Sequence, residues 1–358
     1  MFLHDIRLVN FRNFTQSQFV FKGDRTLIFG DNGRGKSNLL EAVGFLSLAK
    51  SPRGARDKEV STHGCTGFFI TGVFSKGTRS FTIAIRYDSS TGKQAYLDGQ
   101  PLPKLSDLVG TFNTVLFSPE DVDLVLRFPA QRRRILDVLA SQSDVSYLSD
   151  LQAYYRVLAQ RNHLLRNASQ MPDIQLLDPW DVQLAELGGR IVDKRIRLID
   201  EIVSPLVNFY QQLSPRHEVL SISYQASETF SSREEICASL LMGLRNHRKK
   251  EALVGYTLSG PHRDNLAISI NNEDIQKYAS KGQLKCILLA WKLAEAVFLE
   301  RTTGEKPTFL LDDAFSELDP ARAEALLTMI PHFGQVVLSS ARDRDIPLRE
   351  QGFEEIRI

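Results

Sequence analysis

The chain has 358 residues, 42% of them hydrophobic and 24% charged, with a formal net charge of +1 at pH 7. This length predicts two or three domains rather than one, with enough apolar residues for a sizeable core. The near-neutral balance excludes a globally basic protein, so any nucleic-acid-binding surface must come from local charge asymmetry.

Three cysteines, Cys65, Cys237 and Cys286, are far apart in the sequence. They form no CxxC pair, which argues against a sequence-local zinc site or a disulfide scaffold and fits a reducing cytosol. We expect each to be buried, as free cysteines usually are. The first residues lack a signal-peptide core, and no stretch reaches the ~18 consecutive apolar residues of a membrane span. We therefore expect a cytoplasmic protein.

The first hundred residues are predicted to be rich in strands. One helix, Lys36–Leu48, is expected to interrupt them, and Asp98-Gly99 supplies the turn chemistry of a hairpin. The strands are expected where short apolar or alternating runs occur, at Phe19–Phe21, Thr26–Phe29, Phe68–Phe74, Phe81–Tyr87 and Ala95–Leu97.

The middle of the chain, from Gln131 to about His247, has a helical pattern. Asp178-Pro179 predicts an N-cap followed by proline at the first helical position, and Ser232-x-x-Glu235 reads as a capping box. Apolar residues recur at helical spacing over Pro179–Ser214, a helix of roughly 50 Å. This pattern predicts a helical subdomain with a short hairpin-like arm and no long coiled coil.

From about Glu251 the pattern returns to strands. A helix is expected over Gln283–Arg301, then an apolar strand at Thr308–Leu311 and a final strand at Gln335–Ser339. We predict one α/β head built from both ends of the chain, residues 1–130 and 251–358, with residues 131–250 inserted as a mainly α-helical subdomain.

A phosphate-binding motif stands between the second expected strand and the helix that follows. Glycines allow backbone N–H groups to turn toward phosphates, and the helix N-terminus adds its positive dipole end. Lys36 would neutralise the β- and γ-oxygens, and the Ser37 hydroxyl would bind Mg²⁺. The motif is GxxxxGK[ST], and it consists of Gly30, Asp31, Asn32, Gly33, Arg34, Gly35, Lys36 and Ser37.

Two carboxylates end the apolar strand Thr308–Leu311. In a P-loop ATPase the first, Asp312, would hold Mg²⁺ together with Ser37. Asp313 follows it directly and is placed to orient or deprotonate the attacking water. Lys36 and Asp313 are therefore the candidate catalytic residues.

Two further segments indicate the subclass of ATPase. Ser280-Lys281-Gly282-Gln283 precedes a long helix, and Ser316-Glu317-Leu318-Asp319 follows the double aspartate. A helix-capping turn is the alternative for the first segment, yet the order of all these motifs is that of ABC-type ATPases. There Ser280, Gly282, Gln283 and Asp319 would contact nucleotide across a two-fold dimer, since a helix N-terminus supplies an anion site.

Taken together, these residues resemble the RecF DNA replication and repair proteins from end to end. The opening Ile6–Phe14 looks like the family's first strand, and Ser280–Gln283 and Leu311–Asp319 match its catalytic core. Other segments similar to family signatures are Phe117–Asp121, Pro129 with Arg132-Arg133 and Leu136-Asp137, and Gly260–Asp264.

The resemblance implies an ABC-type P-loop ATPase head with ATP and Mg²⁺ as cofactors and weak, DNA-stimulated hydrolysis. It implies an ATP-dependent homodimer that binds single- and double-stranded DNA near gaps. Family members act with RecR and RecO to load RecA and are linked to the SOS response.

Two features depart from wider ABC practice. Transporter-type ATPases carry a switch histidine after the last core strand, where this chain has Ser340-Ala341-Arg342, and His332 precedes that strand. A Q-loop glutamine is also missing, and Glu120 or Asp121 lies where one is expected. Asp313 is left as the main candidate base, and slow hydrolysis is expected.

Three basic clusters could contact DNA phosphates: Lys50–Lys58, Arg132–Arg134 and Arg245–Lys250. None interleaves with aromatic residues as a stacking platform would. The first cluster could instead serve the nucleotide. For His262 and Arg263, functional and structural turn roles both stay open.

Other classes remain as alternatives. An ABC transporter ATPase subunit conflicts with the helical insertion and the missing switch histidine. Chromosome-condensing SMC proteins and zinc-hook repair ATPases carry very long coiled coils, which the sequence lacks, and a P-loop kinase would not need the two ABC segments.

Overall fold

The computed structural model describes residues 1–122, 128–167, 174–214, 218–316, 318–340 and 352–358. The chain divides into two compact units. The head unit comprises Met1–Val122, Pro205–His217 and Ser280–Ile358, and the helical unit comprises Asp123–Ser204 and Glu218–Ala279. Both ends of the chain thus contribute to the head unit.

The bounds of the units differ from the predicted insertion, 131–250. Residues 251–279 belong to the helical unit because strand β10 (Asn265–Ile270) pairs with strand β9 (Leu220–Gln225). Residues 205–217 belong to the head unit, where the Cys286 thiol lies 3.8 Å from the Leu213 carbonyl oxygen.

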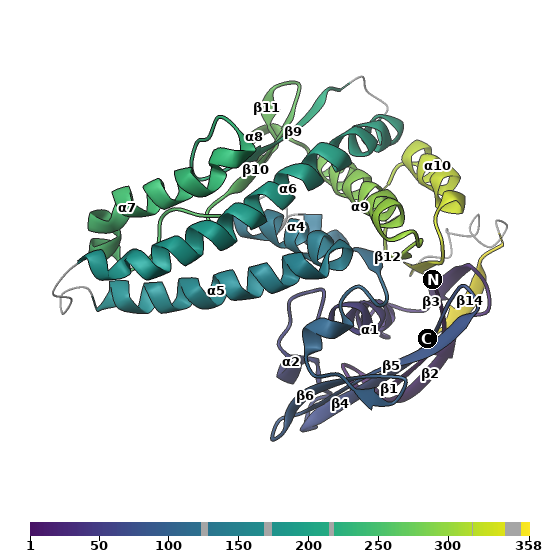
Figure 1. Ribbon diagram of the computed structural model, residues 1–358. Coiled ribbons are helices and arrows are strands. Elements are labelled where there is room, and N and C mark those ends of the chain that lie inside the picture. Colours follow the sequence, from purple (N-terminus) through teal and green to yellow (C-terminus); the bar gives the residue numbers. More distant parts are fainter. Residues whose placement is uncertain (123–127, 168–173, 215–217, 317, 341–351) are drawn as a thin grey trace. The chain divides into compact units, whose positions relative to one another are not determined.

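The strands expected in the first hundred residues are confirmed, and all but Thr26–Phe29 lie in an antiparallel sheet of the head unit (Figure 1). Asp98 and Gly99 both have positive φ, 50° and 78°, as a type I′ hairpin turn requires. The strand order is β2 (Phe14–Val20), β1 (Phe2–Phe11), β4 (Gly67–Lys76), β5 (Arg79–Asp88), β6 (Gly92–Leu97) and β7 (Gln100–Pro101).

A second sheet of the head unit is entirely parallel. Strand β12 is buried along its whole length, as its unbroken apolar run predicts. The strand β14 was not predicted. The order is β14 (Glu354–Arg357), β3 (Arg25–Phe29), β13 (Val336–Ser340), β12 (Thr308–Asp312) and β8 (Thr114–Phe117).

Helix α1 (Lys36–Leu48) contacts both sheets of the head unit and is buried along most of its length. Its apolar side chains and the aromatic side chains around them belong to one apolar core. The head unit also contains α2 (Asp57–Val60), α9 (Lys281–Thr303) and α10 (Pro320–Met329). The expected helices at Lys36–Leu48 and Gln283–Arg301 are confirmed.

The helical unit contains α4 (Pro129–Ser143), α5 (Val145–Arg166), most of α6 (Asp178–Leu213) and α7 (Ile236–Val254). Helix α6 includes Asp178, which was predicted as its N-cap, and ends at Leu213, one residue before the predicted range Pro179–Ser214 does. A small sheet accompanies these helices, with order β11 (Glu273–Asp274), β10, β9, and α8 (Ile275–Tyr278) follows it.

Three further expectations were wrong. Strand β9 interrupts the expected helical block because apolar and serine residues alternate along it with the period of a strand. The side chain of Ser232 does not cap a helix, since the Glu235 carboxylate accepts instead from the Ser231 N–H. Cys65 and Cys237 are exposed, because the first lies in a loop and the second on an outer face of α7, and Cys286 alone is buried.

Arg195 lies fully buried at the centre of a polar network in the helical unit. Its guanidinium donates to the Asp137 carboxylate and the Pro261 carbonyl, both at 2.7 Å, and to the Tyr147 hydroxyl at 3.0 Å. The network links α4, α5 and α6 to the loop before β10, so it fixes the mutual positions of these elements.

We expect Arg195→Met to destabilise the protein by about 3–5 kcal/mol, because it leaves the buried acceptors without their donor. Chemical denaturation measures this loss. Arg197→Met is the control, because it removes an exposed arginine two residues further along the same helix. It should change stability by less than about 1 kcal/mol. Equal stabilities of the two variants would contradict the role of the network.

Candidate functional site

The loop Gly30–Gly35 connects β3 to α1 at the carboxyl edge of the parallel sheet. The first N–H groups of a helix have no partner within it, so the start of α1 presents donors and a positive dipole end. Gly35 precedes the helix with φ 116°, a value that L side chains rarely adopt. The local geometry is that of a phosphate-binding loop.

Asn13 secures this loop from the neighbouring β1–β2 turn. Its amide donates to the Arg34 carbonyl at 2.7 Å, and its Oδ1 accepts from Asn38 at 2.8 Å. A Cβ on Gly35 would lie 2.7 Å from the Asn13 amide, so this contact needs glycine. Sequence reasoning missed the role of Asn13, although the residue lies within the opening segment used for the family resemblance.

The Lys36 ammonium folds back over the loop and donates to the carbonyl oxygens of Gly30 and Asp31 at 2.7 and 2.9 Å. The side chain is buried. Burial lowers the pKa of Lys36, while the nearby carboxylates of Asp313, Asp312 and Asp31 act in the opposite direction. The cation is thus held inside the cradle, beside the carboxylates that end β12.

Ser37 and Asp312, the predicted metal ligands, are in direct contact. The Ser37 hydroxyl donates to Asp312 Oδ1 at 2.8 Å. Ser339, at the end of the neighbouring strand β13, donates to the same oxygen at 2.7 Å. Ser339 was not predicted, and it fixes the carboxylate from the side of the sheet.

Asp313 has φ 45°, in the left-handed region that a non-glycine residue rarely adopts. Its N–H donates to the Ser339 hydroxyl at 3.0 Å, and its carbonyl accepts from the Ser316 hydroxyl at 2.9 Å. The chain therefore turns sharply here, directly after Asp312. Such local strain is common at functional positions.

Ser280, Gly282 and Gln283 form the start of α9. Ser280 Oγ accepts from the Gln283 N–H at 3.3 Å, and Gln283 Oε1 accepts from the Ser280 N–H at 2.7 Å. This reciprocal pair is a capping box, so the segment does form the helix-capping turn named as the alternative above. The helix N-terminus can still bind an anion.

Asp319 caps α10 by accepting from the Arg322 N–H at 3.0 Å. The Arg322 guanidinium also pairs with the Asp319 carboxylate at 3.2 Å and lies 3.1 Å from where a Cβ on Gly282 would stand. The structure thus brings the two predicted ABC segments together through Arg322. Glu317 lies outside the described residues.

Arg53, from the first basic cluster, pairs with Glu120 at 2.6 Å instead of facing solvent freely. The carboxylates of Glu120 and Asp312 both act on the Arg53 guanidinium, which places it near Asp312. Glu120 is one of the two residues expected where a Q-loop glutamine is missing. The structure therefore places both Arg53 and Glu120 on the side of the head unit that carries Asp312.

Two other candidates lie at the two ends of β13: His332 precedes the strand, and Ser340 ends it, paired with Phe29 beside the loop. His332 belongs to a short 3₁₀ turn, Ile330–His332, where its carbonyl accepts from Lys306. Ser340 ends β13, and Ala341 and Arg342 lie outside the described residues.

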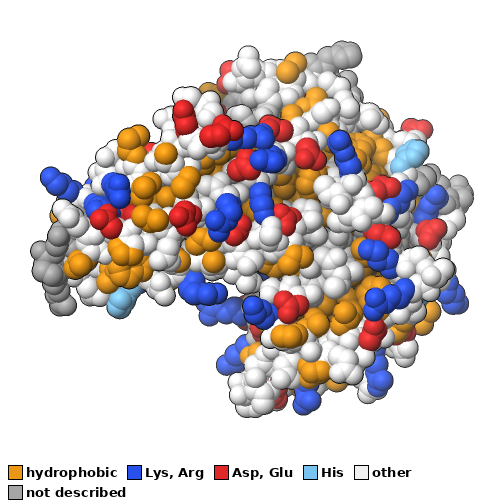
Figure 2. Space-filling model, in the orientation of Figure 1, with side chains coloured by type: hydrophobic (Ala, Val, Ile, Leu, Met, Phe, Trp, Pro, Cys, Tyr) orange, Lys and Arg blue, Asp and Glu red, His pale blue; other side chains and the backbone are white. Residues whose placement is uncertain are grey.

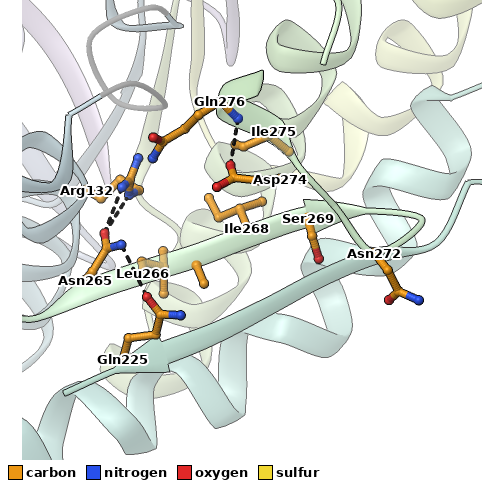
Figure 3. A pocket seen from close by; sticks show the side chains of 11 residues that line it. Arg132, Gln225, Asn265, Leu266, Ile268, Ser269, Asn272, Asp274, Ile275 and Gln276 are labelled. Carbon is orange, nitrogen blue, oxygen red and sulfur yellow. Dashed lines mark hydrogen bonds between the residues drawn. The ribbon is translucent and has the colours of Figure 1, made fainter. Parts of the chain in front are cut away.

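Arg132, in the second basic cluster, is buried and not available to DNA. Its guanidinium donates to Asn265 Oδ1 at 3.1 and 2.8 Å, and Asn265 donates in turn to Gln225 (Figure 3). These side chains line a small cavity beside β9 and β10. Arg132 therefore joins α4 to the small sheet.

In the third cluster, Arg248 is committed to buried contacts with Asp178 and Asp181, and Arg245 lies 3.8 Å from Asp178. His262 also makes a structural contact, since its Nδ1 lies 2.7 Å from the Tyr154 hydroxyl. Burial lowers the pKa of His262 to about 4, so its imidazole is neutral at pH 7.

The residues of the loop fit ATP and Mg²⁺. Mg²⁺ usually binds through one or two carboxylates and substrate phosphates while keeping several waters. The hydroxyl of Ser37 touching Asp312 Oδ1, beside a helix N-terminus and a buried lysine, supplies this donor set. A parallel sheet with this loop and a signature helix defines the head of an ABC-type ATPase.

Comparison with known proteins gives the same class. Residues 2–351 match the family model described as the RecF/RecN/SMC N terminal domain. The DNA replication and repair protein RecF of Chlorobium phaeobacteroides is 35% identical over 351 residues, 96% of each chain. That of Agathobacter rectalis is 32% identical, over 98% of this chain and 95% of the relative. The chain belongs to the RecF family of DNA replication and repair proteins.

Solved structures agree. The recombination mediator protein RecF with ATPrS, in the RecFOR pathway, has a TM-score of 0.89 and 32% identity, covering 100% of this chain and 96% of that one. An Smc head bound to the C-winged helix domain of ScpA has a TM-score of 0.56 and 15% identity, covering 97% and 92%. The second likeness shows a shared fold. In the part of the chain that the structure describes, no helix has the length and apolar character needed to cross a membrane.

Proposed function

We propose that this protein is an ATP-dependent DNA-binding protein of recombinational repair and replication-fork maintenance, acting in the cytoplasm. The contact of Ser37 with Asp312, next to the buried Lys36 and the N-terminus of α1, carries the proposal. Membership of the RecF family and a RecF structure with ATP that is 33% identical support it.

In the proposed site, Lys36 neutralises the β- and γ-phosphate oxygens, and the N–H groups of Gly30–Ser37 bind the remaining phosphate oxygens. Ser37 and Asp312 would hold Mg²⁺, which screens charge on the phosphates when bound. Asp313 orients or deprotonates the attacking water. Since these groups lie at the ends of two strands of one sheet, β3 and β12, binding orders them together.

We further propose that the start of α9 completes the site of a second copy. Ser280 and Gly282 would contact the γ-phosphate held by the partner's Lys36, with Gln283 and Asp319 beside them. Two such sites make ATP the link of a two-fold dimer. ATP binding then closes the dimer on single- or double-stranded DNA at gaps, and slow, DNA-stimulated hydrolysis opens it. Together with RecR and RecO, this closed dimer would help load RecA.

Ser280→Arg tests this arrangement, because it places bulk and charge in the proposed dimer interface and leaves the loop Gly30–Ser37 intact. We expect a monomer that binds ATP almost normally but neither dimerises nor hydrolyses it. Sedimentation with saturating ATP and Mg²⁺ measures the association state. A nucleotide-induced dimer of this variant would contradict the proposed role of α9, and Ser231→Arg is a matched change on the helical unit that should dimerise normally.

A further inference from the structure

Three acid-free segments of the helical unit carry seven arginines, although the whole chain has a net charge of only +1. They are residues 129–136, 151–167 and 252–263, and none contains aspartate or glutamate. Figure 2 shows basic and acidic side chains interspersed over much of the face in view. These three segments, which carry positive but no negative side chains, are therefore a local exception within this chain.

The fold brings parts of these segments together. The Arg133 guanidinium donates to the Asp264 carbonyl at 2.7 Å, and Arg263 donates to the Thr257 carbonyl at 3.2 and 3.1 Å. Both arginines are close enough to His262, which lies between these contacts, for their charges to lower its pKa further. The two guanidiniums thus flank one loop.

Two tyrosines and a third arginine extend this surface. The Arg263 guanidinium stacks on the Tyr256 ring at 4.8 Å, and Tyr155 lies near Arg133. Arg166 packs against Gly255, next to Tyr256. The arginine surface is defined by Arg133, Tyr155, Arg166, Tyr256 and Arg263.

In the part of the chain that the structure describes, the arginines of this surface form no direct ion pairs, although Asp264 and Asp137 act on Arg133 from a greater distance. Among the residues that the structure describes, no carboxylate lies within 4.0 Å of Arg133, Arg166 or Arg263, whereas exposed arginines elsewhere in the unit, Arg190 and Arg233, pair with aspartates. Main-chain carbonyls, which carry no net charge, fix Arg133 and Arg263. Such fixed guanidiniums suit phosphate, which they can bind through two parallel hydrogen bonds.

The dimensions also suit a nucleic acid. Tyr155 and Arg166 are eleven residues apart on α5, about 16 Å along the helix. Duplex DNA rises about 3.4 Å per phosphate of one strand, so this length covers several phosphates. Exposed aromatic rings beside arginines can stack on unpaired bases.

We propose that the arginine surface of the helical unit binds the sugar–phosphate backbone of DNA, with Tyr155 and Tyr256 stacking on unpaired bases. This inference rests on the proposed function, DNA binding, and assigns that binding to particular residues. None of the three basic runs in the sequence contains this set of residues. An acidic protein segment is the competing occupant, and it would leave DNA binding independent of these side chains.

The test measures DNA affinity over a series of salt concentrations, with ATP and Mg²⁺, for Arg166→Gln/Arg263→Gln. Each lost phosphate contact reduces the slope of log Kobs against log [salt] by about 0.9 for a duplex and 0.7 for a single strand. We expect a duplex slope smaller by about 1.8 and weaker binding to all sequences. ATP binding and ATP-dependent self-association without DNA should be unchanged.

Arg190→Gln/Arg233→Gln is the matched control, because it removes two exposed but paired charges from the same unit. It should keep the wild-type slope. Tyr155→Ala/Tyr256→Ala should weaken single-strand binding by about 5- to 150-fold per stacked base and duplex binding less.

Wild-type slope and affinity in Arg166→Gln/Arg263→Gln would overturn the inference and leave the proposed function standing. Failure of the wild-type protein to bind any DNA with ATP would instead overturn the proposed function. Equal losses in the arginine variant and its control would show an unspecific effect of net charge and also overturn the inference.

Discussion

Lys36→Ala is expected to lower ATP affinity by about two orders of magnitude or more. The Lys36 ammonium is buried in the phosphate loop, and truncating one partner of a buried charge pair costs about 2–5 kcal/mol. ATP-dependent retention on DNA should be lost as well. Equilibrium binding of a fluorescent ATP analogue measures the first effect.

Two variants sharpen this result. Lys36→Arg is expected to keep binding and lose turnover, because a guanidinium cannot occupy the position of a compact ammonium. Lys22→Ala removes an exposed lysine of the same unit and should leave affinity unchanged. Wild-type ATP affinity in Lys36→Ala would disprove the assignment of the loop.

The second large effect concerns chemistry rather than binding. Asp313→Asn preserves size but removes the proposed base, so hydrolysis should fall by about 10²-fold or more while ATP still binds. Phosphate release under single-turnover conditions measures the rate. The ATP-bound dimer should then remain on DNA longer, which dissociation kinetics of a labelled duplex can follow.

The turn at Asp313 needs its own control, since this residue has positive φ and asparagine tolerates that conformation. Asn is therefore preferable to Ala, whose side chain would add strain. Ser339→Ala removes the hydroxyl that holds both Asp312 and the Asp313 N–H, and it should lower the rate less. Wild-type turnover in Asp313→Asn would mean that the catalytic carboxylate lies elsewhere.

Much of the head unit could be predicted because its signals are local. The P-loop, the unbroken apolar run of β12 and the helix at Lys281–Thr303 are short patterns, each with its own physical reason. The contact of Ser37 with Asp312 follows once the strands are parallel, since their carboxyl ends share one edge.

The supporting residues could not be predicted in the same way. Asn13 and Ser339 act through contacts with distant residues, and an isolated asparagine or serine gives no pattern that marks such a role. Charge runs were misleading for a related reason. Arg132 and Arg248 are adjacent in sequence to other cations, yet tertiary contacts bury them against acceptors.

Strand β14 has a consequence for how the protein is made. It pairs with β3 along Thr26–Phe29. Ile358, which follows β14, donates its N–H to the Phe29 carbonyl and lies against Gly30. The antiparallel sheet joins strands that are near in sequence and can form early in synthesis. The parallel sheet, in contrast, joins β3 to strands that are translated some three hundred residues later. At 5–20 residues per second the phosphate loop must wait roughly 15–65 s on the ribosome for its neighbours. Nascent chains should therefore acquire the ability to bind ATP only after β13 and β14 have left the ribosome.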